Sequence, residues 1–334
     1  MKKIISVVCA LLMLLSLVAC GNKPADESKP ADGTTAAAAG EKYTIGICQL
    51  IPHVALDAAT EGFIQALKDE LGEENVEFDV QIAAGDTASC SPIVNTFVSN
   101  EVDLILANAT PALQAAVAAT ADIPILGTSV TEYGVGLGIE DFNGTVGGNV
   151  SGTSDLAPLD KQAEMILEWF PEAKTVGLLY CSAEANSKYQ VDEVKRMLEE
   201  KGITATAYPF ADTNDMQAVT QKAADESDVI YVPTDNAVAA AAGTVDGVCR
   251  PLGVPVIAGE QGVCAGCGVA TLSISYYDLG YTTGKMAAEI LTGKADISTM
   301  PIAYSEKFTP MYNAEICEDL GLTPLEGYTA IPTE

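Results

Sequence analysis

Two kinds of segment alternate along the first half of the chain: short apolar runs and longer stretches with apolar residues at helical spacing. The run YTIGICQ over 43–49 indicates a strand, and 55–71 has the apolar spacing of an amphipathic helix. Further strands are expected over 76–82, 102–107 and 125–127, with helices over 92–98 and 112–119. This alternation predicts a parallel sheet with helices on both faces.

After a glycine-rich passage over 134–152 the alternation starts again. Helices are expected over 159–170, 187–201, 216–224, 237–243, 279–291 and 314–320, and strands over 175–180, 205–209, 229–232, 254–258, 269–273 and 301–304. A restart of this kind predicts a second sheet. The fold class is therefore α/β, with two doubly wound parallel-sheet lobes.

The N-terminus has the features of an export signal. Lys2 and Lys3 precede an apolar run over 4–18, and the run ends in Leu17-Val18-Ala19-Cys20. This resembles a bacterial lipoprotein signal, which implies removal of residues 1–19, lipidation of Cys20 and an extracytoplasmic chain anchored to the cell membrane. A plain transmembrane anchor is the alternative, but the run is shorter than the ~20 residues that span a bilayer. Residues 20–42, without large apolar side chains before Tyr43, are expected to form the lipidated cysteine and a flexible tether.

Composition narrows the classes of partner. The chain has 334 residues, 48% of them apolar, and a net charge of −29, which argues against nucleic acid and anionic lipid as partners. Nine cysteines are present, but only Cys264 and Cys267 have a suggestive spacing. Without a second pair of ligands we predict no metal site, and we favour buried thiols in a loop over a local disulfide.

The loops at the carboxyl ends of the predicted strands are where open α/β sheets place ligands. They are rich in hydroxyls, amides and carboxylates and contain no lysine or arginine. An anionic group would then be held by Ser and Thr hydroxyls and helix N-termini, which suits one carboxylate. Glu184, Asp235 and Glu260 offer acceptors for an ammonium group. A zwitterionic ligand satisfies both conditions.

Six short motifs carry a specific resemblance between about Tyr43 and Leu322. They read His53-Val-Ala-Leu-Asp57, Ala109-Thr-Pro111, Asn149-Val-Ser-Gly-Thr-Ser-Asp155, Glu184-Ala-Asn-Ser187, Pro233-Thr-Asp-Asn236 and Tyr277-Asp-Leu-Gly-Tyr-Thr-Thr-Gly284. In this order they resemble the ABC-transporter substrate-binding proteins of the tryptophan and tyrosine uptake family. The resemblance implies a type I periplasmic-binding-protein fold, an aromatic amino acid as ligand, no cofactor, and permease and ATPase subunits as partners.

The same resemblance implies hinge crossings near Ser151, Tyr276 and Ser305. Residues 43–150 and 277–304 would form the first lobe, and 151–276 and 305–334 the second. Thr110, Ser129 and the helix start behind Thr110 would hold the ligand carboxylate. Asp235 would pair with the ammonium group beside Asn186 and Asn236, and the loop containing Gln49, Ile51, Pro52 and His53 would face the ring. Val54 and Tyr133 replace prolines common in the family, which leaves side-chain specificity open.

Other interpretations remain open. A sugar or nucleoside receptor of the same fold, or a glycoside hydrolase using Glu184, Asp235 or Glu260, would also place polar groups here. No nucleophile motif or phosphate-binding loop supports an enzyme. Asp235 could be only a helix cap and His53 only a solvated turn residue. Trp169 lies on the apolar face of a predicted helix, so we expect it in a core or an interface.

Overall fold

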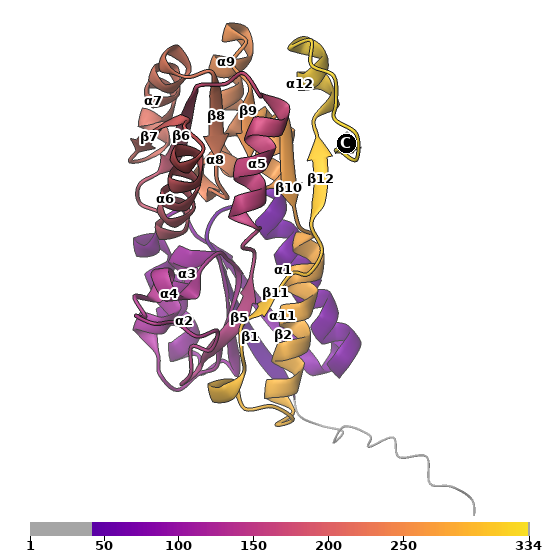
Figure 1. The fold of residues 1–334 in the computed structure, drawn as a ribbon. Coiled ribbons are helices and arrows are strands. Elements are labelled where there is room, and N and C mark those ends of the chain that lie inside the picture. Colours follow the sequence, from indigo (N-terminus) through magenta and orange to yellow (C-terminus); the bar gives the residue numbers. More distant parts are fainter. Residues whose placement is uncertain (1–41, 333–334) are drawn as a thin grey trace, which may run out of the picture. The chain divides into compact units, whose positions relative to one another are not determined.

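The computed structural model describes residues 42–332, which belong to one compact unit. The expected signal segment and the lipidation site at Cys20 lie outside the described residues. Two sheets organise this unit, each flanked by helices (Figure 1). The predicted fold class, two doubly wound α/β lobes, is confirmed.

The first lobe is built on a six-stranded sheet in the order β11-β5-β4-β3-β1-β2, with parallel pairings throughout. Its elements are β1 (Tyr43–Gln49), α1 (Val54–Leu71), η1 (Glu73–Asn75), β2 (Val76–Ile82), α2 (Thr87–Ser99), β3 (Leu104–Asn108), α3 (Thr110–Ala119), β4 (Ile125–Val130), α4 (Tyr133–Leu137), β5 (Val150–Ser154), α11 (Tyr276–Leu291), η2 (Ile297–Thr299) and β11 (Ala303–Tyr304).

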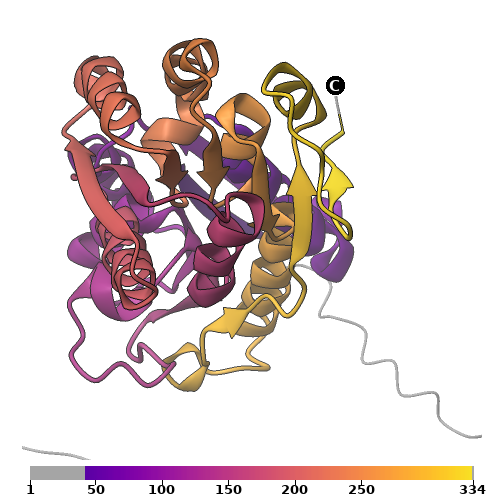
Figure 2. The same cartoon turned by 45° about the horizontal axis from the view of Figure 1, so that its top comes forward.

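The second lobe is built on a seven-stranded sheet in the order β13-β12-β10-β9-β8-β6-β7, in which β12 runs antiparallel to β10. Its elements are α5 (Leu159–Trp169), β6 (Thr175–Cys181), α6 (Ala185–Glu200), β7 (Thr204–Phe210), α7 (Thr213–Glu226), β8 (Val229–Val232), α8 (Asn236–Ala240), α9 (Ala242–Leu252), β9 (Val256–Ala258), α10 (Gln261–Cys267), β10 (Ala270–Ser273), β12 (Thr309–Tyr312), α12 (Ala314–Asp319) and β13 (Thr329–Ala330). Figure 2 shows the carboxyl-terminal strands beside the rest of this sheet.

Alternate residues of the central strands enter different cores, as expected for sheets covered on both faces. Ile45 and Ile47 of β1 pack into the core under α1 and α11, whereas Cys48 packs with α2 and α3. In β6, Leu178 and Leu179 likewise belong to opposite cores. The continuous apolar runs in the sequence are explained by this burial.

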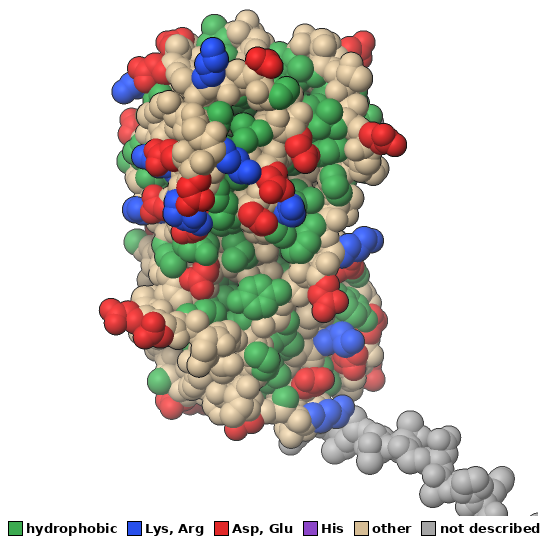
Figure 3. Space-filling view, viewed as in Figure 1, with side chains coloured by type: hydrophobic (Ala, Val, Ile, Leu, Met, Phe, Trp, Pro, Cys, Tyr) green, Lys and Arg blue, Asp and Glu red, His purple; other side chains and the backbone are tan. Residues whose placement is uncertain are grey.

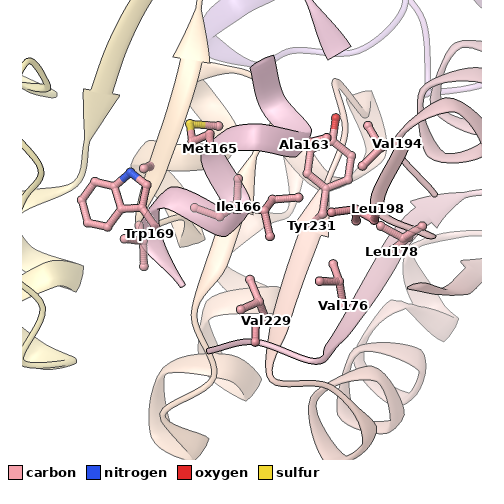
Figure 4. Packing of buried hydrophobic residues seen from close by; sticks show 14 of the residues in the cluster. Ala163, Met165, Ile166, Trp169, Val176, Leu178, Val194, Leu198, Val229 and Tyr231 are labelled. Atoms are coloured by element: carbon pink, nitrogen blue, oxygen red, sulfur yellow. The ribbon is translucent and has the colours of Figure 1, made fainter. Parts of the chain in front are cut away.

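Trp169 belongs to one of these cores, as predicted. It lies at the end of α5, packs edge-on against Tyr328 with 5.2 Å between ring centroids, and joins the cluster that contains Val229 and Tyr231 of β8 (Figure 4). The indole is therefore part of the second lobe's packing and lies away from the space between the lobes.

Helix α11 returns from the second lobe and packs on α1 of the first. The two backbones touch at glycines, because a Cβ on Gly280 would lie 1.9 Å from the Ala59 carbonyl oxygen and one on Gly62 would lie 2.1 Å from that of Tyr277. The glycines of the motif that begins at Tyr277 therefore have a packing role. They fix the long-range connection that makes α11 part of the first lobe.

Three connections join the lobes, over 155–158, 274–275 and 305–308. The first differs from the crossing expected near Ser151, because 150–154 forms strand β5, paired with β4. The sequence VSGTS has little apolar character. Its buried hydroxyl groups find hydrogen-bond partners, as between Thr153 Oγ1 and Thr283 Oγ1 at 2.8 Å. Gly152, at φ 146°, lets the strand approach β4 closely, because a Cβ there would lie 2.1 Å from the Gly127 carbonyl oxygen.

Several other boundaries differ from the expected ones. Helix α2 begins at Thr87 rather than at 92, because Asp86 caps it by accepting the Ser89 N–H at 2.7 Å. Cys264 and Cys267 lie in α10 rather than in a loop, and both are buried free thiols. Within residues 42–332, no helix is long and apolar enough to span a membrane.

Candidate functional site

A small cavity lies between the two lobes, at the carboxyl ends of strands from both sheets. Its volume is about 10 Å³, roughly the space of one water molecule. From the first lobe it is lined by His53, Leu56, Ser129, Thr131 and Tyr276, and from the rest of the chain by Asp155, Asn186, Thr234, Asp235, Asn236, Ala239 and Glu260. The structure thus brings together six of the nine residues predicted for ligand binding.

The turn after β8 places Asp235 at the cavity wall, but its carboxylate is already engaged. Oδ1 accepts the Val238 N–H at 2.9 Å and caps α8, while Oδ2 accepts the Cys181 N–H at 2.7 Å. Burial raises the pKa of this carboxyl group, and the amide donors oppose the shift. The geometry is that of a helix cap that also ties the β8 turn to the end of β6.

Glu184 does not line the cavity but lies directly behind its second-lobe wall. Its carboxylate accepts hydrogen bonds from the Asn236 side chain and N–H, from Asn186 Nδ2 at 3.1 Å and from the Ala237 N–H at 3.0 Å. Burial raises the pKa of Glu184 to about 8. Its contacts hold both asparagines in position.

Glu260 follows β9 and caps α10 by accepting the N–H groups of Gly262, at 2.6 Å, and Val263. Burial raises its pKa to about 7, and the nearby charge of Asp155 adds to the effect. Like Asp235, this residue closes a helix start and presents negative charge to the cavity.

Asp155 is the acidic residue that the sequence reasoning did not select. It is 4% exposed and follows β5 directly. Oδ2 accepts the Tyr276 hydroxyl at 3.0 Å, whereas Oδ1 has no partner among the described residues. Burial raises the pKa of Asp155, against hydrogen bonds from Thr131 and Tyr276. Asp155 is the last residue of the sequence motif that begins at Asn149. Because strand β5 was not predicted, the position of Asp155 at the end of a strand was not recognised.

Other buried polar atoms of the cavity wall also lack partners within the described residues. They are Ser129 Oγ, Asn186 Oδ1 and His53 Nδ1. Buried polar groups are nearly always hydrogen-bonded, so several unpaired atoms around one small cavity indicate a ligand site.

His53 connects the lobes. Its Nε2 lies 3.2 Å from Asn236 Oδ1, which as an acceptor requires the imidazole to donate from Nε2. Burial lowers the pKa of His53, so the ring is neutral and its Nδ1 lone pair is an acceptor. The solvated-turn interpretation of His53 does not fit this buried contact.

The remaining first-lobe candidates lie just outside the cavity. Gln49 is committed to an internal network, donating to Asp57 Oδ1 at 2.6 Å and accepting from Thr60 at 2.7 Å. Thr110 begins α3, is 1% exposed and has an unpartnered hydroxyl. The cap position before it, Ala109, provides no side-chain cap and Pro111 has no N–H, so the N–H groups of Thr110 and Ala112 are the ones left for a ligand.

The backbone is strained beside these groups. Ala109 has φ 97° and Ser129 has φ 53°, both in the region that favours glycine. Ala109 directly follows β3, and Ser129, which lines the cavity, is the last residue but one of β4. Strain of this kind is concentrated at binding sites, where it positions a side chain or an N–H group.

Cationic side chains are absent from the described lining of the cavity. Arg196 pairs with Glu193 and Glu200 on α6, where Figure 3 shows acidic and basic side chains interspersed. Arg250 pairs with acidic residues of α9 and α12. No arginine therefore stands in the described lining of the cavity, and the expectation that hydroxyls and N–H groups would hold an anionic group stays a prediction.

A larger groove adjoins the cavity at Asn236. It has a volume of about 540 Å³ and is lined from both lobes, mainly by apolar and small residues that include Ile51, Pro111, Ala183 and Ala237.

No group of three or more metal-ligating side chains occurs within residues 42–332. The three acids considered for glycoside hydrolysis all accept backbone N–H groups as helix caps or supports.

Comparisons with known proteins agree with this architecture. The model of the ABC transporter substrate binding protein family matches residues 44–334. A tyrosine-binding protein of Clostridioides difficile (strain R20291) is 34% identical over 331 residues, covering 97% of this chain and 94% of the relative.

Two solved structures inform the lobe arrangement. An ABC domain from Streptococcus pneumonia in complex with L-Trp matches with a TM-score of 0.82 at 30% identity, covering 87% of this chain and all of that one. A ligand-free, open substrate-binding protein with adhesive properties from Clostridium difficile covers the same shares at 38% identity, but with a TM-score of only 0.67. The lobes of this chain are therefore arranged more like those of the ligand complex.

These matches are to solute-binding proteins rather than to enzymes, and they span nearly the whole chain. Together with two α/β lobes that enclose a polar cavity, they identify the chain as a member of the ABC transporter substrate binding protein family.

Proposed function

We propose that the protein captures an aromatic amino acid, tryptophan, tyrosine or phenylalanine, between its lobes and delivers it to the permease and ATPase subunits of an ABC importer. The observation that carries this proposal is the pairing, in one buried cavity, of an unpartnered carboxylate oxygen on Asp155 with an unpartnered hydroxyl on Ser129. These are an acceptor for an ammonium group and a donor for a carboxylate. The names of the tyrosine-binding relative and of the L-Trp complex support the ligand class.

Asp155 is the ammonium partner in this proposal, in place of Asp235. An ammonium group carries three donors and needs a buried anion with free acceptor capacity. Each oxygen of Asp235 already accepts an amide N–H, which compensates part of its charge, whereas Asp155 Oδ1 accepts no hydrogen bond from the described residues. Asp235, Asn186 and Asn236 then shape the second-lobe wall.

The ligand carboxylate lies at the first lobe in this proposal. Ser129 supplies a hydroxyl, and Thr110 with the uncapped first turn of α3 supplies a second donor group. A helix N-terminus favours a negative group through its free N–H groups and its dipole. The strained backbone at Ala109 and Ser129 is the expected cost of aiming these donors inward.

The ring has room in the groove that adjoins Asn236. Ile51 lies on its first-lobe side, as expected for the loop after β1, and Ala183 and Ala237 lie on its second-lobe side. Small residues on the second lobe leave space for a planar ring without a preference for one of the three amino acids.

Ligand entry requires the lobes to open. The central cavity of about 10 Å³ is far smaller than an amino acid, and the His53 to Asn236 contact spans the lobes. Three connections between the lobes allow hinge motion of the kind seen in two-lobed receptors. We propose that the protein works outside the cytoplasm, held to the membrane by lipid on Cys20.

A thermal-shift screen of the chain without its first 19 residues tests the proposal. Free aromatic amino acids should raise the unfolding temperature in a concentration-dependent way, because binding to the folded state alone adds to stability. Sugars and nucleosides form the comparison sets. Stabilisation by a sugar or a nucleoside, with no response to any amino acid, would refute the assignment.

A further inference from the structure

We infer that the cavity recognises the ammonium group of its ligand far more strongly than the carboxylate, so that it also binds aromatic amines that have no carboxylate. This class includes tryptamine, tyramine and phenethylamine. The inference rests on the proposed function, since it assumes the same cavity and the same ring.

The first step is the charge of the wall. Asp155, Asp235 and Glu260 line the cavity, and Glu184 lies immediately behind it. Neither lysine nor arginine lines the cavity or the adjoining groove in the described part of the chain. His53, the one histidine of the sequence, is kept neutral by burial. A ligand thus enters a site whose ionisable side chains are all acids, apart from this neutral histidine.

The second step is how these acids are compensated. Backbone N–H groups hydrogen-bond to Asp235, Glu260 and Glu184. Such dipoles offset part of the cost of burying a carboxylate. Asp155 is contacted by the hydroxyls of Thr131 and Tyr276 and by its own backbone N–H, but its Oδ1 has no partner among the described residues although the side chain is only 4% exposed. It therefore lacks a cationic partner, and a ligand ammonium group provides one.

The third step concerns the ligand carboxylate. Its donors are neutral, namely the hydroxyls of Ser129 and Thr110 and the first N–H groups of α3. In a buried site the surrounding carboxylates repel a further anion over several ångströms. Donation from hydroxyls and amides and repulsion from the acids oppose each other. A ligand without its carboxylate should therefore bind with little change in affinity. A ligand without its ammonium group would leave Asp155 and the ligand carboxylate buried without a cation.

Isothermal titration calorimetry with matched ligands tests this inference on the wild-type protein. Tryptophan, tryptamine and indole-3-propionate share one ring and differ only in their charged groups. The amine should bind within about tenfold of the amino acid, the range of one or two net hydrogen bonds. The deaminated acid should bind more than about 100-fold more weakly, as for an uncompensated buried charge. Tyrosine and phenylalanine can each be compared in the same way with the corresponding amine and the corresponding deaminated acid.

The outcomes separate the two proposals. If no aromatic amino acid or amine binds, the proposed function fails. If the amino acids bind but the amines are more than about 100-fold weaker, the carboxylate carries recognition and this inference alone is overturned. Equal binding of indole-3-propionate and tryptophan would overturn it as well.

Two variants locate the effect. Asp155→Asn should weaken tryptophan and tryptamine by similar factors, since both lose the same partner. Asp122→Asn, at an exposed loop acid of the first lobe, should change neither. If Asp155→Asn does not fold, Tyr276→Phe removes one donor to Asp155 and should alter the affinities of tryptophan and tryptamine by the same factor. Loss of tryptophan binding with unchanged tryptamine binding in either variant would contradict the inference.

Discussion

Asp235 ties the turn after β8 to the end of β6 through both of its carboxylate oxygens. Its two oxygens accept the N–H groups of Val238 and Cys181. The sequence showed a polar residue at a strand end but could not show which donors would already occupy it. For Asp155 the opposite holds, because its unpaired oxygen becomes visible only when β5 and α11 are assembled around it.

We predict that Asp235→Ala lowers the free energy of unfolding by about 1–2 kcal/mol, the range for a lost helix cap. The Cys181 N–H is left without its partner as well. Urea denaturation without ligand measures this change. Asp160→Ala, an exposed acid in the first turn of α5, is the control and should have a much smaller effect. Unchanged stability with abolished binding would restore Asp235 as the ammonium partner.

At the scale of elements, the strongly apolar segments were predictable and the polar ones were not. The β1 and β8 bounds agree with the expected ones, since the burial of these strands follows directly from their apolar side chains. Strand β5 and helix α10 were missed, because VSGTS and QGVCAGC have weak propensities and are fixed by neighbouring elements. The same limit applied to the site: the loops that line the cavity were located, but Asp155, which follows the missed strand β5, was overlooked.

The contact between α1 and α11 leads to a prediction for glycine. Gly280→Ala should destabilise the protein by about 1–3 kcal/mol, as for an overpacked core, because the new Cβ would meet the Ala59 carbonyl oxygen at 1.9 Å. Gly247→Ala in α9 is the matched control, since nothing lies within 4 Å of its Cβ position. That change should stabilise by about 0.5–1 kcal/mol through helix propensity. Thermal unfolding of both variants gives the comparison, and equal shifts would argue against close backbone packing.

For the whole molecule, the stability of the closed, ligand-free protein against unfolding should depend on pH through the buried acids. Burial raises the pKa of Glu184 to about 8 and that of Glu260 to about 7 from the ordinary value of 4.5. The folded, closed chain then binds more protons than the unfolded chain between these values, so its stability falls as pH rises. His53 has a lowered pKa and acts in the opposite sense only near and below 6.5. Between pH 6.5 and 8 the acids should therefore dominate.

We predict that the free energy of unfolding of the ligand-free protein decreases from pH 6.5 to pH 8. A bound ammonium group favours ionised carboxylates, so ligand binding in this range should release protons. Calorimetric titrations at one pH in buffers of different ionisation enthalpy measure that release directly. Asp155→Asn should reduce it, because the ammonium group then loses its nearest anion, whereas Asp122→Asn should leave it unchanged. Proton uptake on binding would mean that the cavity acids are already ionised and that the ligand adds negative charge to them.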